Sequence, residues 1–162
     1  MLNKKIPHFA FSIKYKGIAR ELISDIEIIN PLNNQRKKYK AIWDTGATNT
    51  VITSKVLKEL SLTIVDIATI VGVNSEPEHA QVALFNLLLP NNVSIKGVRG
   101  SVCTIGGDAD ILIGMDIIKF GDFAISNGEG QTLFSFAIPP FENKTDLLEK
   151  ANKTNKNNKL TN

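Results

Sequence analysis

Residues 43 to 52 read Trp-Asp-Thr-Gly-Ala-Thr-Asn-Thr-Val-Ile, and this stretch decides the fold. It places the carboxylate of Asp44 on a glycine turn that follows an apolar strand and precedes threonines and branched apolar residues. Gly46 lets another backbone approach where a side chain would block it. The pattern occurs once in the sequence. Chemistry that needs two such carboxylates therefore requires two chains to meet.

A second signal lies downstream, where residues 110 to 118 read Asp-Ile-Leu-Ile-Gly-Met-Asp-Ile-Ile. An apolar run that ends in glycine before a short helix is weak evidence alone, because many folds contain one. Because the apolar run follows the Asp44 turn in this order, the two stretches together form a specific signal. The two stretches resemble the retropepsin-like aspartic proteases, including the cellular branch typified by the DNA-damage-inducible ubiquitin shuttle proteins. The resemblance covers roughly residues 20 to 138, which is most of the chain.

The resemblance implies a role for each matching position. Asp44 would be the catalytic carboxylate, Thr45 the hydroxyl that braces the partner loop, and Gly46 a backbone acceptor for the substrate peptide. The hairpin between Ile70 and Val82 would be the flap that covers the substrate. Val51 and Leu112 match apolar positions that line the central pockets. The full set of implied substrate-binding residues is Ala47, Thr48, Val51, Gly72, Val73 and Leu112.

Two charges of the viral members are missing here. Those proteins usually carry an acidic residue where Thr48 stands and an arginine where Met115 stands, and these two charges pair. Because both are absent together, no buried ion is left without a partner. The loop can form, but polar recognition of the substrate near it must differ. The flap differs as well, since its tip has a single glycine, Gly72, followed by Pro77.

The rest of the chain reads as short strands separated by turns. Ile26 and Ile28 alternate with acidic residues, which is the period of a half-buried strand. Further strands are expected at residues 38–43, 63–73, 81–89, 93–98, 101–105, 111–113, 123–126 and 132–138, with a helical segment at 54–60. We therefore predict an all-β fold, a closed barrel of the retropepsin-like aspartic protease type, with one short C-terminal helix at residues 114–120.

A single domain at residues 1–141 is predicted from the length of 162 residues and the apolar share of 43%. Residues 142–162 form a polar tail rich in Lys and Asn, which we expect to be disordered apart from a turn of helix at residues 146–151. Much of the net charge of +3 comes from lysines in this tail. Neither nucleic acid nor a membrane is therefore expected as a partner.

The sequence contains no pattern typical of a metal or another cofactor. His8 and His79 lie in unrelated segments, and Cys103 reads as a small buried hydrophobe. A single cysteine cannot form an internal disulfide, which fits a reducing compartment. Pro7 and His8 interrupt the first apolar run, so no signal peptide is predicted. A cytoplasmic location is therefore expected.

Two carboxylates about 3 Å apart share a proton, so one can activate water while the other donates a hydrogen bond to a peptide carbonyl. We therefore predict a homodimeric aspartic endopeptidase in which two copies of Asp44 activate the water. Two alternatives stay open: a catalytically silent dimer that binds peptides, and pairing with another protein that carries its own Asp-Thr-Gly. An ordinary turn at Asp44 is disfavoured by the apolar run that ends at Gly114.

The hairpin at residues 122–138 is predicted to form the dimer interface together with the Asp44 loop. Phe134 and Phe136 alternate along it with Ser135 and Ala137. In the cellular branch that the chain resembles, the equivalent hairpin forms a sheet between two chains. We expect edge-strand pairing across a two-fold axis to bury these aromatic side chains.

Overall fold

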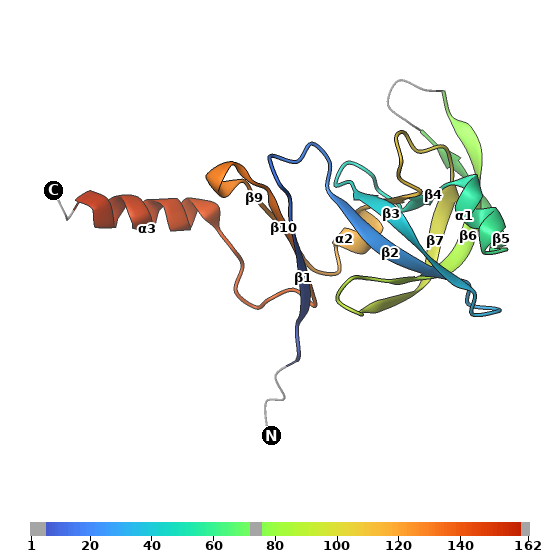
Figure 1. Cartoon of the computed structure of the whole chain (residues 1–162), viewed down its shortest axis with the longest axis horizontal. Helices are drawn as coiled ribbons and strands as arrows, with labels where there is room; N and C mark the ends of the chain where they lie inside the picture. Colours follow the sequence, from blue (N-terminus) through green and yellow to red (C-terminus); the bar gives the residue numbers. More distant parts are fainter. Residues whose placement is uncertain (1–5, 72–75, 160–162) are drawn as a thin grey trace.

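The structure is a computed structural model, and it describes residues 6–71 and 76–159 (Figure 1). Its strands are β1 (Phe9–Lys14), β2 (Ile23–Ile29), β3 (Arg36–Trp43), β4 (Val51–Ile52), β5 (Thr63–Ile70), β6 (Glu78–Leu88), β7 (Ser94–Val102), β8 (Ile111–Ile113), β9 (Asp122–Ser126) and β10 (Leu133–Ile138). Its helices are α1 (Ser54–Glu59), α2 (Met115–Ile118), the short 3-10 turn η1 (Gly128–Gly130) and α3 (Leu147–Lys159).

The barrel is a sheet closed on itself. Strands β2, β3, β8, β4, β7 and β6 are hydrogen-bonded in this order, and β2 pairs again with β6 to complete the circuit. β5 extends the sheet beyond β6, and the two form the hairpin that stands up from the barrel in Figure 1. The interior is filled by fully buried apolar side chains, including Ile26, Ile52, Phe85 and Ile111. Closure therefore buries a continuous core and leaves few free strand edges.

β1, β10 and β9 form a separate three-stranded sheet with β10 at its centre. The aromatic face of this sheet packs on Trp43, the last residue of β3. The ring centroids of Phe134 and Phe136 lie 5.3 and 4.9 Å from that of Trp43. Trp43 Nε1 donates to Ser24 Oγ at 2.8 Å, so the indole N–H is satisfied inside the core. The aromatic cluster therefore joins this sheet to the barrel.

This architecture confirms the predicted all-β closed barrel, and α2 is the short helix expected at residues 114–120. Ile26 and Ile28 of β2 are fully buried, as their alternation predicts. Residues 93–98 and 101–105 were expected as two strands, but the single strand β7 joins residues 94–98 to 101–102 and ends before residues 103–105. Gly97, with a φ of +69°, lies at an irregularity in the pairing of β7 with β6.

The expectation that the hairpin aromatics lie at a dimer interface is wrong. Phe134 and Phe136 are fully buried in the core of their own chain. β10 cannot offer a free edge either, because it lies between β1 and β9. The third strand comes from β1, which lies outside the region covered by the family resemblance. Phe11 of β1 pairs with Phe136 and packs in the same aromatic cluster.

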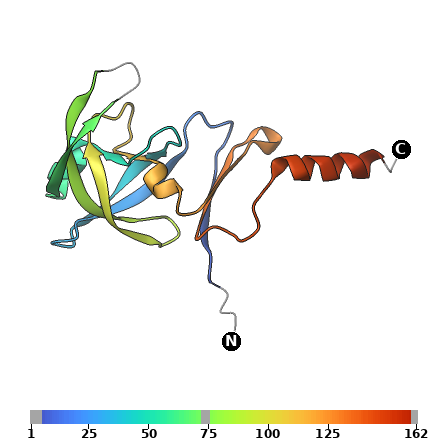
Figure 2. The same cartoon turned by 180° about the vertical axis from the view of Figure 1, so that it is seen from behind.

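The tail contains more helix than the sequence predicted. α3 spans 13 residues where a single turn was expected, and it lies apart from both sheets in two opposite views (Figures 1 and 2). Leu147 and Leu148 are 71% and 70% exposed. An ion pair along the helix joins Lys153 Nζ to Glu149 Oε1 at 2.6 Å. None of the described tail residues belongs to the buried core.

The aromatic cluster generates a stability prediction. We expect Phe136→Ala to lower the free energy of unfolding by about 3–5 kcal/mol, because it leaves a cavity against Trp43 in a fully buried site. Phe120, which is 47% exposed, is the matched control, and Phe120→Ala should cost much less. Urea unfolding followed by circular dichroism measures both. Equal losses for the two variants would contradict the packing described here.

Candidate active site

The position of Asp44 is set by the parallel pairing of β3 with β8. Trp43 pairs with Ile113 in this ladder, and the next N–H, that of Asp44, donates to the Ile113 carbonyl at 2.9 Å. The Asp44 side chain is half-buried, whereas Thr45 and Gly46 are exposed. The predicted catalytic loop therefore lies at the solvent-facing end of a buried pair of strands.

The Asp44 carboxylate is oriented by its own loop. Gly46 N–H donates to Asp44 Oδ1 at 2.8 Å, which makes a turn closed by the side chain. Ala47 N–H donates to the Asp44 carbonyl at 3.3 Å. A Cβ atom at position 46 would lie 3.1 Å from Asp44 Oδ1, closer than an ordinary contact. Glycine at this position therefore keeps the carboxylate in its turn geometry without a clash.

Helix α2 fastens the loop from behind. Met115 N–H donates to the Ala47 carbonyl at 2.8 Å, and Asp116 N–H donates to the Thr48 carbonyl at 3.0 Å. Thr50 Oγ1 donates to Asp116 Oδ1 at 2.9 Å. The loop is thus held by two backbone bonds and one side-chain bond, without a charge pair between positions 48 and 115.

The contact between Thr50 and Asp116 was not predicted from the sequence. Asp116 lies in the first turn of α2, where the helix dipole favours a carboxylate. Thr50 is fully buried, and a buried hydroxyl needs a hydrogen-bond partner. The position of this threonine directly before the apolar Val51 could have indicated a buried hydroxyl. The neighbouring sequence does not identify its hydrogen-bond partner.

Gly114 stands where the loop and α2 meet backbone to backbone. A Cβ atom at this position would lie 2.6 Å from the Asn49 carbonyl carbon and 3.0 Å from the Ala47 carbonyl oxygen. The backbone N–H of Gly114 also points at Thr50 Oγ1, at 3.4 Å. The glycine that ends the apolar run is therefore required by space rather than by a special backbone angle.

The predicted pocket residues lie on the strands beside this loop. Val51 on β4 pairs with Leu112 on β8, and both side chains are half-buried. Leu112 directly precedes Ile113, whose carbonyl holds Asp44. The β5–β6 hairpin expected as the flap is present. Gly72 and Val73, the predicted substrate contacts at its tip, lie outside the described residues.

Ala47 and Thr48 differ in what they can offer a substrate. The N–H and carbonyl of Ala47 are both engaged, by the Asp44 carbonyl and by Met115 N–H. The Thr48 carbonyl is taken by Asp116 N–H, but its exposed hydroxyl makes no hydrogen bond within the described ranges. Thr48 can therefore offer a side-chain hydroxyl, whereas Ala47 offers mainly its methyl group.

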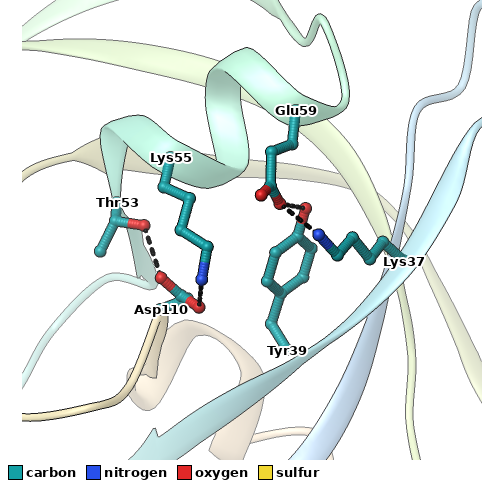
Figure 3. Close-up of polar contacts among 6 residues, drawn as sticks. All are labelled: Lys37, Tyr39, Thr53, Lys55, Glu59 and Asp110. Carbon is teal, nitrogen blue, oxygen red and sulfur yellow. Dashed lines mark hydrogen bonds and ion pairs between the residues drawn. The ribbon is translucent and has the colours of Figure 1, made fainter.

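One polar cluster joins helix α1 to β3 (Figure 3). Glu59 Oε2 on α1 accepts hydrogen bonds from Lys37 Nζ at 2.9 Å and from the Tyr39 hydroxyl at 2.8 Å. Burial, and then the hydrogen bond to Glu59, raise the pKa of Tyr39. The hydrogen bonds from Lys37 and Tyr39 lower the pKa of Glu59. The cluster fixes α1 against the strand that leads into the Asp44 loop.

A second cluster joins the start of α1 to the segment before β8 (Figure 3). Lys55 Nζ lies 2.7 Å from Asp110 Oδ2, and Thr53 Oγ1 donates to Asp110 Oδ1 at 3.1 Å. The hydrogen bond to Asp110 raises the pKa of Lys55. Asp110 therefore holds α1 at the base of β8.

The remaining titratable residues singled out in the sequence are His8, His79 and Cys103. His8 stacks on the ring of Phe141 with centroids 4.4 Å apart, and His79 Nδ1 lies 3.4 Å from Thr69 Oγ1. Cys103 is half-buried rather than buried, and burial raises the pKa of its thiol. In the described part of the chain, no cluster of three or more His, Cys, Asp or Glu side chains could hold a metal ion. No described helix is both long enough and apolar enough to cross a membrane.

The comparisons with known proteins agree with this geometry. The family described as "gag-polyprotein putative aspartyl protease" matches residues 31–119, which contain the Asp44 loop and α2. The match covers more than half of the chain, so the chain belongs to this family of retropepsin-like aspartic proteases.

Among solved structures, the chain is similar to a retropepsin-like aspartic protease from Rickettsia conorii, with a TM-score of 0.53 and 20% sequence identity. The match covers 82% of this chain and 96% of that chain. At this identity the likeness shows the retropepsin-like fold. A search of curated proteins gave no significant match.

The close approach at Gly114 can be tested by adding one methyl group. We expect Gly114→Ala to destabilise the fold by roughly 1–3 kcal/mol, because its Cβ would meet backbone atoms that cannot move aside independently. Gly106→Ala is the control, since a Cβ at position 106 would meet no atom within 4 Å. Thermal unfolding of both variants decides the matter. A Gly114→Ala protein as stable as Gly106→Ala would show that the loop and α2 are not packed this closely.

Proposed function

We propose that this protein is an aspartic endopeptidase that acts as a homodimer and hydrolyses peptide bonds with an activated water. The observation that carries the proposal is the Asp44 carboxylate, which stands half-buried on an exposed loop with Oδ1 held by Gly46 N–H. Family membership supports the same activity. One chain supplies one such carboxylate, so the active unit contains two chains.

In the proposed reaction, the two Asp44 carboxylates of a dimer share one proton because two like charges in contact cannot both ionise. The ionised carboxylate accepts a proton from water, whose oxygen attacks the peptide carbonyl carbon. The protonated carboxyl donates its hydrogen bond to the carbonyl oxygen as negative charge develops there. The tetrahedral intermediate then collapses, the C–N bond breaks, and the amide nitrogen leaves with a proton from the carboxyl groups.

The residues around Asp44 suit the binding of an extended peptide. The exposed Gly46 backbone offers a carbonyl acceptor beside the carboxylate, and the exposed Thr48 hydroxyl lies two residues further along. Val51 and Leu112 provide apolar surface next to the loop. The β5–β6 hairpin would cover the bound peptide from the opposite side and exclude water from the reacting groups.

The second copy of the chain has two surfaces available for docking. Thr45 is exposed, and its hydroxyl makes no hydrogen bond within the described residues, so it can brace the loop of the partner. β9 is one edge of the three-stranded sheet, and its Ile125 is 48% exposed. The other edge strand, β1, is partly covered, because Asn91 Nδ2 donates to the Phe9 carbonyl. We therefore assign inter-chain strand pairing to β9.

The catalytic role of Asp44 is tested by Asp44→Asn. Asparagine keeps an Oδ1 acceptor for Gly46 N–H, so the loop should persist, but it cannot share a proton with the partner carboxylate. We expect a folded protein that loses about 10²-fold to 10⁴-fold or more of its peptide hydrolysis. The control is Asp25→Asn, at an exposed position on β2. Retained cleavage by purified Asp44→Asn would sink the assignment, whereas peptide binding without cleavage by the wild type would favour the silent binding module.

A site built from two chains predicts that specific activity depends on protein concentration. Specific activity should fall on dilution, because half a site per chain leaves the monomer inactive. Ile125→Asp should weaken the dimer by placing a desolvated charge at the β9 edge, whereas Leu32→Asp, at a 73% exposed turn position, should not. Sedimentation velocity run beside a peptide assay reports both quantities. A fully active monomer, or equal dimerisation of the two variants, would contradict this arrangement.

A further inference from the structure

The strands beside Asp44 carry a continuous row of side chains on one face of the sheet. Val51 on β4 pairs with both Leu112 on β8 and Ser101 on β7, and Ser101 pairs with Val82 on β6. Paired residues on neighbouring strands share a face of a sheet. The row therefore starts at Leu112, which adjoins the residue that holds Asp44, and runs across to the β5–β6 hairpin.

The pairing of β6 with β5 shows which residues of the hairpin share this face. Ala80 and Glu78 lie two and four residues before Val82 on β6, so they share its face, and Ile70 of β5 pairs with Glu78. Ala80 and Val82 are buried, and they alternate with Ala83 and Phe85, which belong to the barrel core. The intervening His79 alternates to the other face of β6, where its Nδ1 lies 3.4 Å from the hydroxyl of its pairing partner Thr69, and its side chain also borders the adjoining cavity. Glu78 thus places a carboxylate on the groove side of the flap.

A cavity of about 450 Å³ opens next to this carboxylate. Its walls come from the hairpin, from the end of β7 with the segment after it, and from the start of α1: Ile70, Glu78, His79, Ala80, Val102, Cys103, Thr104 and Ser54. The volume lies within the range of about 300–1,000 Å³ that small-ligand pockets occupy. The walls combine polar groups with a few aliphatic ones, so a long basic side chain can pack its alkyl stem on Ile70 and Val102 while its charged end reaches Glu78.

Glu78 brings uncompensated negative charge to this cavity. After burial, the Glu78 charge is the second cause that raises the pKa of the Cys103 thiol, so its field reaches the cavity wall. Lys55 pairs with Asp110, and Arg99 pairs with Asp66. Within the described ranges, no ion pair involves Glu78. A carboxylate without an ion-pair partner, at the wall of a cavity, favours a cationic ligand.

We infer that this cavity is a substrate subsite that selects a basic side chain, lysine or arginine, by pairing it with Glu78. The inference rests on the proposed function, because it assigns the groove between Asp44 and the flap to a bound peptide. It names a substrate class for the same site: peptides with a basic residue close to the scissile bond. Glu78 acts as a specificity-determining residue and takes no part in the bond-breaking steps.

The test measures cleavage of matched peptides that carry lysine or its uncharged analogue norleucine at each position around the scissile bond. The wild type should prefer lysine at one position by roughly ten- to a hundredfold in kcat/KM, the size expected for a hydrogen bond to a charged group. Glu78→Gln should remove this preference, and Glu78→Lys should shift it toward glutamate. Glu76→Gln, which removes an exposed charge from the same hairpin, should leave the preference unchanged.

A binding measurement separates this inference from the proposed hydrolysis. The same peptides are titrated against Asp44→Asn and against Asp44→Asn/Glu78→Gln by fluorescence anisotropy, with and without added salt. Tighter binding of the lysine peptide that requires Glu78 and weakens with salt supports the subsite even if no cleavage occurs. Cleavage or binding with equal preference for lysine and norleucine overturns it, and so does a preference that survives Glu78→Gln.

Discussion

The parallel pairing of β3 with β8 is the constraint on which the fold and the site both depend. It joins residues 41–43 to residues 111–113, far apart in the sequence. The pairing fixes Trp43 in the aromatic core and places Asp44 N–H on the Ile113 carbonyl. A slip of one residue would turn each side chain of β3 to the other face of the sheet. Core packing and carboxylate placement are therefore set by the same hydrogen bonds.

The Asp44 turn and the short helix α2 could be predicted because the signal for each lies within a short stretch of sequence. At Gly46 and Gly114 a Cβ atom would come too close to neighbouring atoms. The glycines in the sequence therefore mark the positions of these close approaches. The alternation of Ile26 and Ile28 likewise fixes a half-buried strand before any partner is known. These features depend on short stretches of chain, and the structure confirms the fold that they indicate.

Features that depend on distant partners were missed. The alternation of Phe134 and Phe136 identifies an apolar face, but alternation cannot tell whether that face meets its own barrel or a second chain. The outcome is decided by Trp43, which lies in another strand. The pairing of β1 with β10 and the bond between Thr50 and Asp116 are non-local in the same way. Helix α3 was missed for a different reason. The polar composition of the tail indicates that it cannot pack into a core, but a helix can form without such packing.

In the proposed dimer, each chain supplies half of the reacting site. Asp44 stands oriented on an exposed loop, β9 offers a strand edge, and the flap carries Glu78 over the groove face. Each feature has a definite use only when a second carboxylate faces the first. A dimeric peptidase explains all of them with one arrangement, in which the two chains contribute equally to the reacting centre.

The most direct measurement mixes wild-type chains with Asp44→Asn chains at a concentration where wild-type specific activity no longer rises. With a threefold excess of the variant and random pairing, about a quarter of wild-type chains find a wild-type partner. The account predicts that activity per wild-type chain falls to about that fraction, because a mixed dimer has one carboxylate. Activity per wild-type chain that stays constant across the mixing series would contradict a site built from two Asp44 residues.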